Sequence, residues 1–92
     1  MVDISNGTIS SKYSVNLINQ KILNSPDVST YIEISEENLH LLYLVHKNPD
    51  CTYTLSLGYE RVLHNVTSKA VAKMIVAMID ILSTEINHPY HL

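Results

Sequence analysis

The segment from Thr67 to Ile86 constrains the fold more than any other part of the chain. It contains no glycine or proline, opens with a hydroxyl residue that can cap a helix, and repeats its apolar residues at steps of three and four. This pattern predicts one long helix with an apolar stripe wide enough to cover a small sheet. The stripe consists of Val71, Met74, Ile75, Met78, Ile79, Leu82 and Ile86.

The opposite side of the predicted helix carries little charge. Between Ala70 and Leu82 only Lys73 and Asp80 are charged. A helix that is apolar nearly all round is usually covered on both sides, and a chain of 92 residues has little material for this. We therefore expect a second molecule, another copy of the chain, to cover this side in a homodimer. The predicted helix interface is Ala72, Lys73, Val76, Ala77 and Asp80.

Length and composition predict a single domain over residues 1–92. The hydrophobic share of 46% is ordinary for a globular protein, and no apolar run is long enough to span a membrane. The chain opens without a signal-peptide pattern, and its one cysteine, Cys51, excludes an internal disulfide. We therefore expect an intracellular, cytoplasmic protein. The frequent Ile, Asn and Tyr residues, whose codons are rich in A and T, hint at a low-GC genome such as that of a virus or phage.

The middle of the chain predicts antiparallel strands joined by tight turns. Asn48-Pro49-Asp50-Cys51 suits such a turn, because proline is favoured at the second position. A hairpin centred there pairs Leu44 with Leu55 on one face of the sheet, since the side chains of a strand alternate. The other face then carries Tyr43 and Val45.

A second turn agrees with the first on which face is apolar. Ser29 to Ser35 alternates cleanly, and Glu36-Glu37-Asn38 suits a three-residue loop with Asn in the left-handed position. This loop pairs Ile32 with Leu42 and completes a three-stranded antiparallel meander under the C-terminal helix, an α+β fold. The predicted core of the sheet is Ile32, Ile34, Leu42, Leu44, Leu55 and Leu57.

The N-terminal part leaves alternatives open. Asn16 to Asn24 predicts a short helix that ends before Ser25-Pro26-Asp27, although Tyr13 and Val15 begin an alternation that also suits a strand. Asn6-Gly7 fits a two-residue hairpin turn, and a frayed N-terminus is the alternative.

The segment after the third predicted strand is also ambiguous. Gly58 is expected to end or bend that strand, and Tyr59 to Val66 is either its continuation after a bulge or a connecting loop. We expect residues 1–15 and 87–92 to be loosely attached.

No residue pattern predicts catalysis. His88 and His91 are three apart, but Pro89 prevents the helix that would align them for a metal. His40 and His46 are expected to close the edges of the apolar face, with a pH switch as the alternative. Glycine-rich phosphate loops and nucleophile or zinc motifs are not found in the sequence. We therefore expect no enzyme, no metal site and no cofactor.

Tyrosines suggest a recognition surface on the sheet face away from the helix. In the predicted pairing Tyr31 and Tyr43 lie opposite each other there. Amphipathic aromatic residues are typical of recognition surfaces. The alternatives are a cross-strand pair that only stabilises the sheet, or a face covered by the N-terminal segment. The predicted partner-binding face is Tyr31, Glu33, Leu41, Tyr43 and Val45.

Two resemblances to known groups add expectations. Thr67-Ser68-Lys69-Ala70-Val71-Ala72-Lys73 looks like the second-helix entry of the double-stranded RNA-binding domain, a Ser-Lys-Lys-x-x-Ala-Lys type of motif. The predicted order of helix, three strands and helix over Asn16 to Ile86 is similar to that family too. The resemblance implies that Lys69 and Lys73 contact phosphates. Ala70 stands where the family has a further lysine, and its Gly-Pro-x-His loop is missing.

The second resemblance is to phage-encoded anti-defence inhibitors, including anti-CRISPR proteins, in size, acidity and α+β character. It implies inhibition of a larger protein or nucleoprotein complex. The net charge of −3 argues against nucleic-acid binding by charge alone. We therefore expect a small non-enzymatic protein-binding module that regulates or inhibits a larger protein. The alternatives are a divergent binder of double-stranded RNA, and a small-molecule-binding dimer with a pocket near Tyr53, His46 and Met74.

Overall fold

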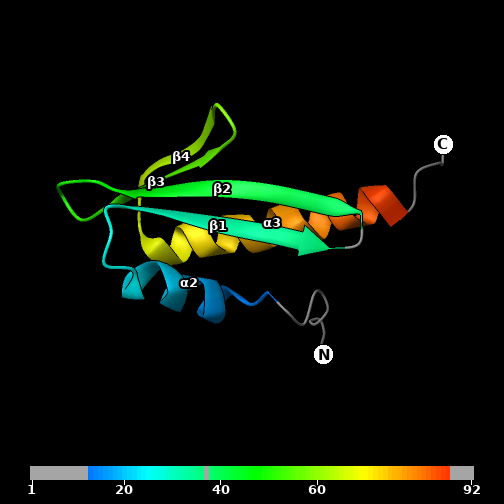
Figure 1. Cartoon of the computed structure of the whole chain (residues 1–92), viewed down its shortest axis with the longest axis horizontal. Helices are drawn as coiled ribbons and strands as arrows, with labels where there is room; N and C mark the ends of the chain where they lie inside the picture. The colour runs from blue at the N-terminus through cyan, green and yellow to red at the C-terminus, as the bar shows by residue number, and fades with distance from the viewer. Residues whose placement is uncertain (1–12, 37, 88–92) are drawn as a thin grey trace.

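The computed structural model describes residues 13–36 and 38–87 (Figure 1). Along the chain it contains helix α2 (Val15–Asn24), strands β1 (Ser29–Glu36), β2 (Leu39–Lys47), β3 (Tyr53–Leu57) and β4 (Glu60–Val66), and helix α3 (Ser68–Asn87). The predicted α+β class is confirmed, with four strands in place of three. The expectations for Asn6-Gly7 and for the tail after Asn87 lie outside the described residues.

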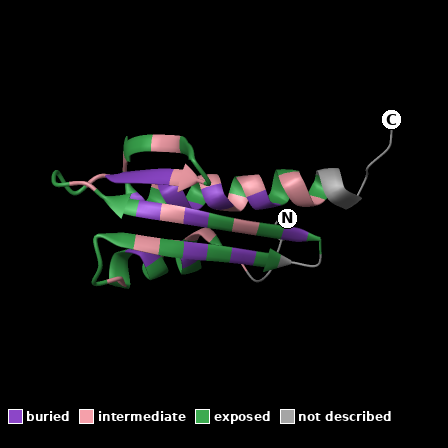
Figure 2. Ribbon diagram, turned by 45° about the horizontal axis from the view of Figure 1, so that its top comes forward, coloured by how far each residue is buried: buried purple, intermediate pink, exposed green. Residues whose placement is uncertain are grey.

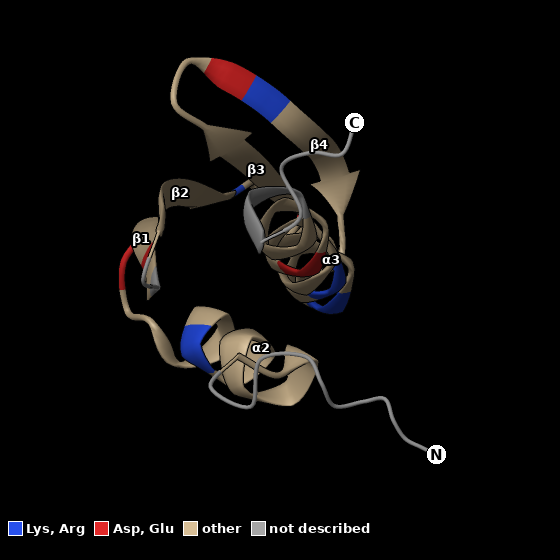
Figure 3. Cartoon of the chain, turned by 90° about the vertical axis from the view of Figure 1, so that its right-hand side faces the viewer, with Lys and Arg blue, Asp and Glu red and all other residues tan. Residues whose placement is uncertain are grey.

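The four strands form one antiparallel sheet in the order β1-β2-β3-β4. Seen end-on, the sheet bends around α3, and α2 closes the side next to β1 (Figure 3). Both described helices therefore lie on one face of the sheet. We call this the inner face, and the opposite one the outer face.

Local signals explain where the helices begin and end. The Ser14 hydroxyl accepts a hydrogen bond from the Leu17 N–H at 3.1 Å, which caps α2. The helix ends at Asn24, directly before Ser25-Pro26. At the start of α3 the Thr67 hydroxyl accepts from the Ala70 N–H at 3.1 Å. Both predicted helices are confirmed, and α2 replaces the strand alternative.

The fourth strand is a hairpin partner of β3. Leu57 pairs with Glu60, so Gly58 and Tyr59 form a two-residue turn, and Gly58 has a φ of +64° that glycine adopts without steric cost. The chain therefore reverses at Gly58. Both interpretations of Tyr59 to Val66, a continued strand or a loop, were wrong.

The predicted pairing of β2 with β3 is wrong by one residue. Val45 pairs with Leu55, and Asn48 donates its N–H to the Thr52 carbonyl at 2.8 Å. The turn thus has three residues, the last of which, Cys51, has a left-handed φ of 71°. The Thr52 hydroxyl and N–H donate to the Asp50 carboxylate, and they lower the pKa of that group from its usual value.

The pairing of β1 with β2 is also shifted by one residue. Ile32 lies opposite Tyr43, where the sequence predicted Leu42, because Glu36 pairs with Leu39. Since both hairpins are shifted, β1 and β3 keep their predicted inner residues and only the central strand β2 is turned over. Tyr43 and Val45 are buried, whereas Leu42 is 51% exposed.

The core fills the space between the inner face and the helices. Strands β1 and β2 alternate between buried and more exposed residues, and the buried stripe of α3 lies under the sheet (Figure 2). Burying one such apolar side chain contributes about 1.5–3 kcal/mol. The buried apolar residues are Ile18, Ile22, Ile32, Ile34, Leu39, Tyr43, Val45, Tyr53, Leu55, Val71, Ala72, Ile75 and Ile79. Of the residues predicted for this core, Leu42 and Leu44 are not among them, and Leu57 is half-buried against its edge.

Candidate protein-binding surface

The outer sheet face carries the candidate binding surface. Because β2 is turned over, Leu42 and Leu44 lie on this face next to β1. Tyr31 pairs with Leu44 and is 65% exposed, and Glu33 pairs with Leu42. We call the apolar group Tyr31, Leu42 and Leu44 the outer patch.

Polar pairs lie on either side of the outer patch. The Glu33 carboxylate contacts His40 Nε2 at 2.9 Å, and both side chains are mostly exposed. The Ser29 hydroxyl is 3.1 Å from His46 Nδ1. Exposed pairs of this kind contribute little to stability. Their effect is to orient polar groups around an apolar centre, which is the arrangement of a protein interface.

The predicted partner-binding face is divided between the two sides of the sheet. Tyr31 and Glu33 lie on the outer face, as predicted, but Leu41, Tyr43 and Val45 belong to the inner face. Tyr43 is fully buried and donates its hydroxyl to Met78 Sδ at 3.5 Å, and burial raises its pKa to about 12. The cause is the one-residue shift of both hairpins, at Cys51 and at Glu36. The prediction missed it because a left-handed cysteine leaves no recognisable pattern in the sequence.

The predicted helix interface is likewise divided. Lys73, Ala77 and Asp80 are exposed on α3, Val76 is half-buried, and Ala72 is completely buried within the chain. The reason is α2, which packs beside α3 and is joined to it where the Ser68 hydroxyl donates to Asn19 Oδ1 at 2.6 Å. Ala72 cannot contact a second molecule, and part of the cover expected from a dimer comes from the chain itself.

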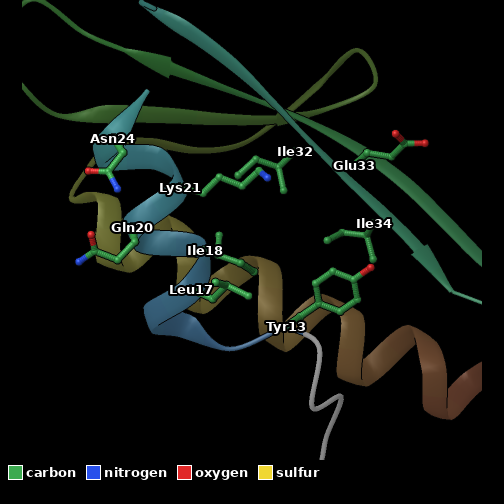
Figure 4. Close-up of a pocket in the computed structure, with 9 residues that line it drawn as sticks. All are labelled: Tyr13, Leu17, Ile18, Gln20, Lys21, Asn24, Ile32, Glu33 and Ile34. Atoms are coloured by element: carbon green, nitrogen blue, oxygen red, sulfur yellow. The ribbon is translucent and has the colours of Figure 1, made fainter. Parts of the chain in front are cut away.

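A cleft of about 360 Å³ separates α2 from β1 (Figure 4). Leu17, Ile18, Ile32 and Ile34 make it apolar, and Lys21 extends across it toward β1. Local patterns did not reveal this cleft, because it depends on where α2 lies relative to a strand. The pocket expected near Tyr53, His46 and Met74 is not formed by those residues together, since Tyr53 is buried on the inner face and His46 is exposed on the outer one.

Within residues 13–36 and 38–87, no group of three His, Cys, Asp or Glu side chains is placed to hold a metal ion. Cys51 is exposed at its turn. Neither α2 nor α3 is long and apolar enough to cross a membrane.

Comparisons with protein-family models, curated proteins and solved structures find no match. The resemblance to the double-stranded RNA-binding domain therefore rests on the sequence motif alone. In this fold β4 comes between the third strand and α3, which the order expected from that family lacks. Lys69 and Lys73 are both exposed on α3.

Proposed function

We propose that this protein is a non-enzymatic binding module that regulates or inhibits a larger protein, and that it binds that partner through the outer patch. The observation that carries the proposal is the exposure of Tyr31 and Leu42, diagonal neighbours on adjacent strands, on a sheet face that no described element covers. Large apolar side chains grouped in this way mark interaction sites more often than isolated ones do.

The composition of the surface favours a protein partner. An aromatic residue at the centre with hydrogen-bonding groups at the rim is the usual anatomy of a protein interface, and tyrosine is among the residues that dominate binding energy. The Glu33 carboxylate at the rim can accept a further hydrogen bond, so we expect a basic side chain of the partner there. Size and acidity favour an anti-defence inhibitor as the particular role.

Duplex RNA is a weaker candidate. Sequence-independent binding depends on several lysines or arginines that release counterions from phosphates. Lys69 and Lys73 are the two residues of α3 that fit this purpose, and the net charge of the chain is −3. We therefore expect that gel shifts with duplex RNA at low salt show no binding that depends on these two lysines. The Lys69→Ala and Lys73→Ala variants should then behave like the unchanged protein.

The test is capture of the partner from the native host, followed by titration of the purified partner. Leu42→Glu places a charge within the outer patch and should weaken binding by about 100-fold, or about 2.7 kcal/mol. Tyr59→Ala is the matched control, since Tyr59 is fully exposed at the β3–β4 turn and outside the patch. Equal affinity of the Leu42→Glu and Tyr59→Ala variants for the partner would refute the proposal.

A further inference from the structure

Strand β1 is an edge of the sheet and pairs with β2 only. In an antiparallel pair, alternate residues direct their backbone groups toward the neighbouring strand. The Lys47 N–H donates to the Val28 carbonyl at 2.8 Å. In this register the backbone groups of the even-numbered residues of β1 bond to β2, and those of the odd-numbered residues point away from β2, beyond the edge of the sheet. The backbone groups of Tyr31, Glu33 and Ser35 therefore point away from the sheet.

The outward groups are mostly unused. The Ser35 N–H donates to the Tyr13 hydroxyl at 3.4 Å, which confirms its direction. Among the residues that the structure describes, no backbone group bonds to the outward N–H and C=O of Tyr31 and Glu33. An unpaired edge of this kind is a template for another strand.

The cleft beside α2 lies along the same edge. Glu33 is part of its lining, yet its side chain points away from α2 (Figure 4) and contacts His40 on the outer face. The part of Glu33 that lines the cleft is thus its backbone. The unpaired backbone groups and the apolar walls of the cleft, Leu17, Ile32 and Ile34, border the same space.

The cleft also carries a positive charge. Lys21 extends across it, and the one carboxylate in its lining, Glu33, is turned toward His40. No salt bridge involves Lys21 within residues 13–36 and 38–87. The ammonium group therefore favours an anionic occupant.

We propose that the edge of β1 and the cleft beside α2 bind an extended peptide segment of another protein, which adds a fifth strand to the sheet. Its backbone bonds to the outward groups of Tyr31 and Glu33. Every second side chain of the segment is apolar and faces the cleft, because strand side chains alternate. A carboxylate side chain of the segment pairs with Lys21. This surface is distinct from the outer patch and does not depend on the function proposed above.

The first experiment titrates the whole protein with fluorescent eight-residue peptides, the length of β1. They alternate valine with threonine and carry one glutamate at varied positions, with glutamine in the matched set. We expect the best glutamate peptide to bind about tenfold more tightly than its glutamine counterpart. Two further peptides carry N-methyl groups on their odd-numbered or on their even-numbered amides. One of them should lose binding and the other should keep it, since only one edge of the peptide faces β1.

The second experiment changes the protein. Lys21→Glu should weaken the glutamate peptide by about tenfold or more, with Lys73→Glu on α3 as the control of equal charge change. Glu33→Pro removes one outward N–H without removing a bond to β2, and Glu33→Gln is its control. Circular dichroism measures whether each variant is folded. If Glu33→Pro fails to fold, the N-methylated peptides test the same hydrogen bonds.

Three results would overturn the proposal. One is that no peptide of either set binds. Another is that both N-methylated peptides still bind, which would indicate an apolar ligand site without strand addition. The third is a dimer, free of peptide, that Lys21→Glu or Glu33→Pro dissociates, which would assign the edge to a second copy. Leu42→Glu should leave peptide binding unchanged, so failure here and failure of the outer patch are distinguishable.

Discussion

At Cys51 the backbone adopts a left-handed conformation with a φ of 71°. Residues with a Cβ pay for this conformation in steric strain, and glycine does not. The conformation adds one residue to the β2–β3 turn, and this determines that Leu42 faces solvent while Tyr43 faces the core. The conformation of one turn residue thus contributes, together with the shorter β1–β2 turn, to deciding which side chains form the outer patch.

Replacing Cys51 with glycine should therefore stabilise the protein. We expect Cys51→Gly to raise the free energy of unfolding by about 0.5–1 kcal/mol, because relief of strain exceeds the added entropy of the unfolded chain. Cys51→Ala is the control, since it retains a Cβ and should show no gain. Urea unfolding measures both, and equal stabilities would contradict the argument.

At the scale of elements, α2 changes the surroundings of α3. The sequence predicted that the weakly charged side of α3 needs an external partner, but α2 covers the part of it around Ala72 and Asn19 bonds to Ser68. Val76, predicted for the dimer interface, is half-buried against the core of its own chain. The apolar circumference of α3 is thus shared between the sheet and a second helix.

The substitution Val76→Glu distinguishes these views of α3. If Val76 packs within the chain, glutamate there should lower the free energy of unfolding by about 1–3 kcal/mol, because a charge loses part of its hydration. Ala77→Glu, one position along on an exposed site, should change it by less than about 0.5 kcal/mol. Urea titrations followed by circular dichroism provide the comparison. A Val76→Glu variant with unchanged stability would contradict this packing and would instead support Val76 as part of an intermolecular interface.

At the scale of the whole molecule, helices lie on one sheet face only, and large apolar residues are exposed on both sides of the sheet, including Leu17 and Leu23 on α2. Tyr31 and Leu42 are exposed on the outer face, and Ile81 is 60% exposed on α3. The two proposed binding surfaces meet at β1, whose odd-numbered side chains lie on the outer face and whose odd-numbered backbone groups point away from β2 at the edge beside the cleft. One edge strand can thus take part in two kinds of contact.

The same distribution predicts a monomer at micromolar concentration. A stable dimer usually buries about 800 Å² on each partner, and the exposed side of α3 offers Ala77 and Ile81 among charged or polar residues. Light scattering measures the mass. A dimer that Ile81→Glu converts to monomer would instead establish the homodimer through α3 that the sequence predicted.

The positions of both helices and of the first three strands could be predicted from the sequence, because they depend on local periodicity and on turn residues such as Pro26 and Pro49. The inner residues of β1 and β3, including Ile34 and Leu55, were also predicted correctly. The fourth strand was missed because a single glycine at position 58 is compatible with a bulge, a bend or a complete reversal of the chain.

By itself, the sequence determined which segments are helical or extended, and the order of those segments determined the α+β class. Tertiary structure alone decided which face of β2 is buried, which side of α3 is covered by α2, and where the cleft beside β1 lies. The physical reason is that periodicity is a property of neighbouring residues. The face that a central strand presents instead depends on the number of residues in the turns on either side, and one residue at Cys51 or Glu36 exchanges the two faces.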